Sequence, residues 1–183
     1  MYTEKYEATL GISEYLEKYV DVERFLQGCR ENCPNYASKW CCPPYDFDVI
    51  AYWKQYSQLQ IHAVKIIIEE DERCETYEGD ALMQRIMEIL SAEKEKIGAE
   101  LAQMENEIPG SCALAAGSCA ICKECTRPKG TECRYPEKMR YSIESLGGNV
   151  VQVMKDELGI EMKWAEAGKL PEFYVLVGGL LMA

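Results

Sequence analysis

Histidine is almost absent from the sequence, with His62 as the single example in 183 residues. Ser-His-Asp and Cys-His catalysis and zinc hydrolase sites all depend on histidine, so this scarcity argues against them unless His62 reaches the cysteines. His62 lies in a β-branched stretch, where a core or edge position is the expected role. The sequence also lacks a G-x-G-x-x-G fingerprint and a P-loop. Gly147-Gly148-Asn149 is interpreted as a simple turn before a helix rather than an anion site.

Positive charge is scarce as well: 20 Lys and Arg stand against 31 Asp and Glu, which gives a net charge of −11. A nucleic-acid surface needs a basic stripe, and docking on anionic lipid needs basic clusters. We therefore expect no nucleic-acid partner and no membrane partner. An acidic protein suits a basic protein partner, although solubility alone explains the charge.

Long hydrophobic runs are missing too. The longest apolar run, from Phe173 to Ala183, is too short to span a bilayer and contains two glycines. The first residues have neither the basic segment nor the apolar segment of a signal peptide. These features predict a cytoplasmic protein.

Cysteine, by contrast, is abundant, with ten residues that fall mainly into two groups. In a reducing compartment, clustered cysteines usually bind metal rather than form disulfides. Cys74 and Cys112 lie outside the motifs, and we interpret them as incidental and as a buried structural thiol, respectively.

The C-terminal group has the spacing C-x-x-C-x-x-C followed by one more cysteine after seven residues, and its members are Cys119, Cys122, Cys125 and Cys133. Bacterial ferredoxins use the same triple spacing to bind a 4Fe–4S cluster, with a fourth cysteine that precedes proline. Here the fourth cysteine lies farther along the chain, so Cys133 departs from the ferredoxin spacing. Zinc, which also accepts four thiolates, is the competing metal.

The N-terminal group consists of Cys29, Cys33, Cys41 and Cys42 in a segment broken by prolines. A second 4Fe–4S cluster is expected here, with a single zinc ion or a redox-active dithiol as the alternatives. Adjacent cysteines point in different directions, so one of Cys41 and Cys42 is expected to bind elsewhere or stay free, and Cys42 is the preferred ligand. Two cubane clusters need eight thiolates, the number that the two groups supply together.

The remaining pattern predicts an α/β or α+β fold with a small mixed sheet, in a single domain of residues 1–183. The cysteine-rich loops, at about 28–45 and 117–140, should lie at one end. Strands are expected over 6–10, 59–68, 112–116 and 173–182, and helices over 13–27, from Asp46 or Asp48 through Tyr56, over 80–107 and from Asn149 to Gly159. Ser13 is the expected cap of the first helix, and the acidic stretch 69–80 is expected to be a surface loop.

Several segments together resemble a known family: Cys33-Pro-Asn-Tyr, Trp40-Cys41-Cys42-Pro-Pro, the run Ala116 to Cys125, and Ser142-Ile-Glu-Ser-Leu-Gly147. They resemble a prokaryotic family of predicted metal-binding proteins of unknown function, common in anaerobes. In that pattern the cysteine before Pro-Pro aligns with Cys42. The resemblance implies metal binding and names no reaction.

Three functions fit these features. The first is electron transfer to or from a partner redox enzyme, with one or two 4Fe–4S clusters. The second is a cluster-dependent enzyme or accessory factor, which one non-cysteine position on a cluster would favour. The third is a structural zinc module for protein binding. A homodimer is compatible with each of them.

Overall fold

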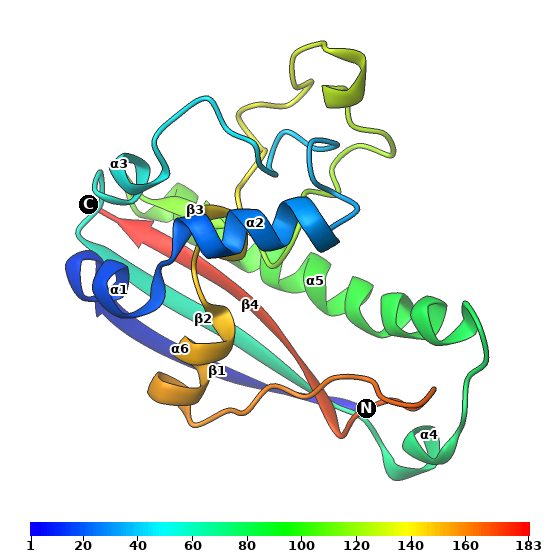
Figure 1. Ribbon diagram of the computed structural model, residues 1–183. Coiled ribbons are helices and arrows are strands. Elements are labelled where there is room, and N and C mark those ends of the chain that lie inside the picture. The colour runs from blue at the N-terminus through cyan, green and yellow to red at the C-terminus, as the bar shows by residue number, and fades with distance from the viewer.

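The computed structural model describes residues 1–183 and contains one four-stranded sheet (Figure 1). The strands are β1 (Tyr2–Gly11), β2 (Gln58–Ile67), β3 (Cys112–Leu114) and β4 (Phe173–Met182). The helices are α1 (Ile12–Tyr19), α2 (Val22–Asn32), α3 (Val49–Trp53), α4 (Glu70–Cys74), α5 (Ala81–Glu107) and α6 (Val150–Leu158). The strand order is β1-β2-β4-β3 and every pair is antiparallel. The α/β class is confirmed, and the strands that were expected to be mixed in direction all pair antiparallel.

The two central strands, β2 and β4, are buried on both faces, which separates the core into two parts. In β2, Leu59 and Ile61 pack on one face, whereas Val64 and Ile66 pack on the other. The first face is covered by α1, α3 and α6, and the second by α5 (Figure 1). The sequence of β2 alternates polar and apolar residues from Gln58 to Ala63, and its buried apolar residues divide between the two faces.

The elements with strong local signals form as predicted. Helix α5 follows the apolar spacing of its sequence, and its Ile97 and Leu101 are buried against the sheet. Asp48 caps α3 by accepting from the backbone N–H groups of Ile50 and Ala51. Asn149 caps α6 in the same way, and Gly159 ends it in the left-handed conformation.

Four local predictions differ from the structure. Strand β1 begins at Tyr2 rather than at residue 6. The single helix expected over 13–27 is two helices, because Val20 pairs with Gly148 as an isolated bridge and Asp21 caps α2. The cap of α1 is Gly11, so the Ser13 assignment is wrong. The acidic stretch contains helix α4, whose first turn carries three acidic residues, which the helix dipole favours there.

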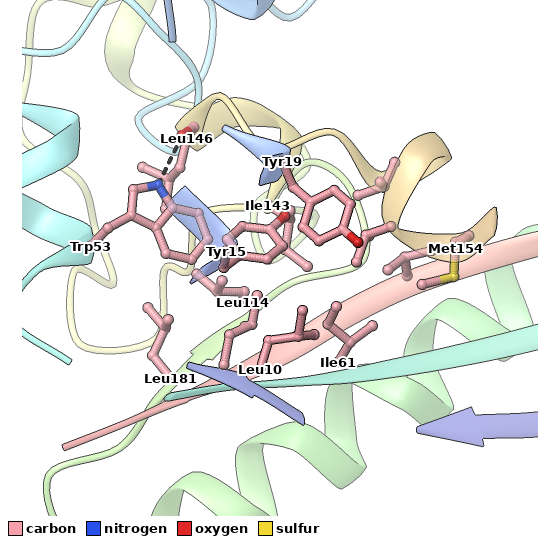
Figure 2. Close-up of a cluster of buried hydrophobic side chains, with 14 of the residues drawn as sticks. Leu10, Tyr15, Tyr19, Trp53, Ile61, Leu114, Ile143, Leu146, Met154 and Leu181 are labelled. Atoms are coloured by element: carbon pink, nitrogen blue, oxygen red, sulfur yellow. Dashed lines mark hydrogen bonds between the residues drawn. The ribbon is translucent and has the colours of Figure 1, made fainter. Parts of the chain in front are cut away.

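The part of the core under α1, α3 and α6 also fixes the position of the segment before α6 (Figure 2). The Trp53 indole N–H donates to the Leu146 carbonyl at 2.9 Å. Asp21 N–H donates to the Gly147 carbonyl at 3.0 Å, which attaches the start of α2 to the same segment. The chain between α2 and α3 and the chain between β3 and α6 contact each other through Lys39 and Arg127 (Figure 1). No helix combines the length and the apolar character that crossing a bilayer requires.

Candidate metal centre

The C-terminal cysteines line one cavity of about 60 Å³. The thiol-bearing residues around it are Cys41, Cys119, Cys122, Cys125 and Cys133. Apolar side chains complete the wall, among them Trp40 and Met139. The cavity thus collects the four cysteines of the C-terminal motif and one cysteine of the N-terminal group.

The loop that carries these cysteines begins with a glycine because the backbone there is left-handed. Gly117 has φ of 82°, and a Cβ there would lie 3.1 Å from Lys94 Nζ on α5. Farther along, the Thr126 hydroxyl donates to the Glu132 carbonyl at 2.8 Å and closes the loop between Cys125 and Cys133. These two features shape the loop at its start and between its last two cysteines.

The N-terminal group begins on a helix rather than in a loop. Cys29 lies in the last turn of α2 and Cys33 is its C-cap, where the Cys33 N–H donates to the Cys29 carbonyl at 3.1 Å. Residues four apart on a helix share one face, so both thiols belong to one side of α2. Burial raises the pKa of Cys29, and the neighbouring Cys33 raises it further. The expected loop from residue 28 is therefore helical up to Asn32.

The adjacent cysteines, both buried, associate with different groups. The Cys119 N–H donates to Cys41 Sγ at 3.2 Å, so Cys41 belongs with the C-terminal cavity. Cys42 lies instead within electrostatic reach of Cys33 and Cys29. Its pKa is lowered, mainly by the contact with the Cys41 thiol, and the two Sγ atoms are 3.7 Å apart. Cys41 thus belongs to the five thiols around the cavity. Cys42 belongs with Cys29 and Cys33, so the adjacent pair connects the two groups.

One thiol of the cavity, Cys119, opposes ionisation. Contact with the Cys41 thiol raises the pKa of Cys119 strongly, and burial adds to this effect. A bound metal cation reverses this preference, because a coordinating thiol is deprotonated outright. The half-buried thiols of Cys119, Cys122, Cys125 and Cys133 are the ligand type that a soft metal prefers.

Arg127 connects the two cysteine loops. Its guanidinium donates to the Lys39 carbonyl at 2.8 Å and also to the Cys42 and Pro44 carbonyls. It also lies over the Trp40 ring, 5.4 Å from the centroid. Lys39 of the N-terminal loop donates in turn to the Cys119 carbonyl of the C-terminal loop, at 2.9 Å. Sequence reasoning missed these two cations, and the only available signal was their place inside the cysteine loops.

We expect the Arg127→Ala variant to lose the connection between the loops. Three backbone carbonyls lose a charged donor, and each such hydrogen bond contributes about 1.5–3 kcal/mol. Limited proteolysis should then cut within residues 33–48 or 117–140 faster than in the wild type. Arg24→Ala, an exposed change near the start of α2, is the control. Equal cleavage rates in the two variants would contradict this role of Arg127.

The remaining candidates lie apart from these groups. Cys74 is exposed, and Cys112 is half-buried with its sulfur 3.5 Å from the Tyr52 hydroxyl. His62 lies on β2 with Nδ1 3.4 Å from Glu7, while its Nε2 is buried without a partner. No three Cys, His, Asp or Glu side chains lie at the mutual distances of a single bound metal ion. The assignment of particular cysteines as ligands stays a prediction.

Comparison with known proteins bears on the metal chemistry alone. No curated protein and no solved structure matches the chain. One family model does match, and it covers residues 16–182, which include both cysteine groups. The chain therefore belongs to the family described as predicted metal-binding protein (DUF2284), as the resemblance in its cysteine motifs indicated.

Proposed function

We propose that this protein is an iron–sulfur electron carrier that exchanges electrons with a partner redox enzyme in the cytoplasm. In this proposal Cys119, Cys122, Cys125 and Cys133 hold a 4Fe–4S cluster. The observation that carries it is the single cavity lined by all four of these cysteines. Soft thiolates favour iron–sulfur clusters, and three cysteines in continuous x-x spacing are typical of them.

The surroundings of the cavity fit a group with negative charge. Lys39, Lys123 and Arg134 line it, although the whole chain carries a net charge of −11. The backbone N–H that donates to Cys41 Sγ is the kind of contact that tunes a cluster's potential. When bound, the cluster supplies one-electron transfer, while the chain provides thiolates, cations and N–H donors around it.

A second cluster is proposed at Cys29, Cys33 and Cys42. Cys41 and Cys42 belong to neighbouring sites, and their sulfurs are 3.7 Å apart. This contact offers a short path for an electron between the two sites. Two neighbouring clusters with an internal path suit a carrier better than a structural module.

Purification without oxygen, with iron, sulfide and zinc determined per chain, tests the proposal. Two cubane clusters predict about eight irons and an EPR signal after reduction with dithionite. About four irons would support the C-terminal cluster alone. A colourless protein that contains stoichiometric zinc would contradict the proposal and support the structural zinc module.

A second candidate, a cluster-dependent enzyme or accessory factor, is favoured by one observation. The N-terminal site collects three thiols rather than four, because Cys41 associates with Cys119. A cluster with a non-cysteine position has a place for a substrate. Cyanide added to the reduced protein should shift the EPR signal if that position exchanges ligands, and an unchanged signal argues for electron transfer alone.

A further inference from the structure

A second cleft, of about 460 Å³, lies at the end of the sheet where β2 ends and β4 begins. Its walls are Arg73 of α4 and most of the segment 162–172. It shares no lining residue with the cavity of the cysteines. In Figure 1 the cysteine loops lie above the sheet, whereas the orange segment that forms this cleft lies below it. Its volume falls within the usual range of small-molecule sites, about 300–1,000 Å³.

One wall of the cleft is held in place by backbone hydrogen bonds. The Glu166 N–H donates to the Lys169 carbonyl at 3.2 Å, and the Lys169 N–H donates to the Glu166 carbonyl at 2.9 Å. Between them Ala167 and Gly168 have φ of 50° and 78°, which makes a tight turn. The Tyr77 N–H donates to the Gly168 carbonyl at 2.8 Å and attaches the turn to the chain after α4. A ligand therefore meets a wall that is already ordered, which lowers the cost of binding.

Three cations face this cleft without an ion pair. They are Arg73, Lys163 and Lys169, and none of them lies within 4.0 Å of a carboxylate oxygen. The whole chain carries a net charge of −11, so unpaired cations gathered at one place stand out. The Nε atom of Arg73 is also buried with no hydrogen-bond partner. A buried donor without an acceptor is costly, and a bound anion satisfies it.

The other side chains of the cleft limit the kind of anion. Trp164 lines it and is 63% exposed, so one face of its ring is free to stack on a planar group. Glu166 and Glu172 line it as well. Their carboxylates repel a ligand that carries negative charge alone, but they accept hydrogen bonds from hydroxyl and amino groups. The cleft thus suits a ligand that combines an anionic group, a planar ring and polar hydrogens.

We propose that this cleft binds a phosphorylated small molecule with a planar ring, the chemical class of the mononucleotides. The phosphate contacts Arg73 and the two lysines, the ring stacks on Trp164, and the carboxylates accept from hydroxyl or amino groups of the ligand. This site is separate from the proposed clusters and does not depend on them. A protein that contains zinc, or no metal, would overturn the electron-carrier proposal and leave this one unaffected.

Calorimetric titration of the full chain, purified without oxygen, tests the proposal. The probes are AMP, GMP, CMP, UMP and flavin mononucleotide, and at least one of them should bind in an equimolar ratio. Inorganic phosphate and the matching nucleoside or riboflavin each offer one part of the ligand, so each should bind about tenfold more weakly or worse. Binding should also weaken as the salt concentration rises, because salt screens the cations. Absence of binding by every probe at millimolar concentration would overturn the proposal. Phosphate that binds as tightly as the best nucleotide would overturn it too, because the ring would then contribute nothing.

Substitutions place the ligand within the cleft. Arg73→Gln should weaken binding of the best probe by about tenfold or more, and Trp164→Ala by about fivefold or more. Lys54→Gln is the control, because Lys54 is an exposed lysine at the other end of β2, and it should bind as the wild type does. If Arg73→Gln has a lower melting temperature, Lys169→Gln repeats the test with an exposed side chain. Equal affinities of the cleft variants and Lys54→Gln would show that the nucleotide binds elsewhere and would overturn the assignment.

Discussion

The Cys122→Ser variant should lose the C-terminal cluster and about half of the iron, from about eight to about four atoms per chain. Cys122 is the middle ligand of the C-x-x-C-x-x-C run and lines the cavity together with the other three cysteines of its motif. A serine hydroxyl is a harder and far less acidic ligand than a thiol, so it is a poor replacement on iron. Iron and sulfide analysis and EPR of the reduced protein measure the loss.

Cys74→Ser is the control for that experiment. Cys74 is the exposed cysteine at the end of α4, outside both cysteine groups. This variant should keep its full iron content and both EPR signals. If the C-terminal signal survives intact in Cys122→Ser, the assignment of this cysteine as a ligand is wrong. If Cys41 replaces Cys122 as a ligand, the iron content stays near the wild-type value while the reduction potential of the C-terminal cluster shifts.

The sequence predicted those elements whose signal is local. Helix α5 shows its apolar spacing over seven turns, β4 is a continuous apolar run, and β2 is rich in β-branched residues. Strand β1 was only partly predicted, because Glu4 and Lys5 interrupt its pattern before Tyr6. It is an edge strand that pairs with β2 alone, so one of its sides tolerates charge.

The break between α1 and α2 depends on a distant contact. Val20 pairs with Gly148, more than a hundred residues away in the sequence. A Cβ at Gly148 would lie 2.5 Å from Ile143 Cγ2, so the close approach needs glycine at this point. No pattern within residues 13–27 indicates such a contact, so the sequence predicted a single helix.

The cysteine groups were visible in the sequence, but their partition was not. Spacing identified both groups, the family resemblance supported the preference for Cys42, and in the structure Cys42 lies within electrostatic reach of Cys29 and Cys33. One of Cys41 and Cys42 was expected to bind elsewhere or stay free. In the structure Cys133 lines the cavity with its own motif, and Cys41 is the one that crosses. Side-chain direction at adjacent residues depends on the loop that Arg127 and Lys39 hold in place.

This partition predicts opposite results for the two adjacent cysteines. Cys42→Ser should lose the N-terminal cluster and about half of the iron, because Cys29 and Cys33 then lack their third thiolate. Cys41→Ser should keep about eight irons, since four cysteines still line the cavity without it.

The Cys41→Ser variant should change the potential of the C-terminal cluster instead, because the Cys119 N–H loses its sulfur acceptor at 3.2 Å. EPR-monitored redox titration measures that shift, and each variant is the control for the other, since the substitutions are identical and adjacent. Loss of the N-terminal cluster in Cys41→Ser and its retention in Cys42→Ser would reverse the assignment. Equal losses in both would mean that the two sulfurs, 3.7 Å apart, serve one shared site rather than two.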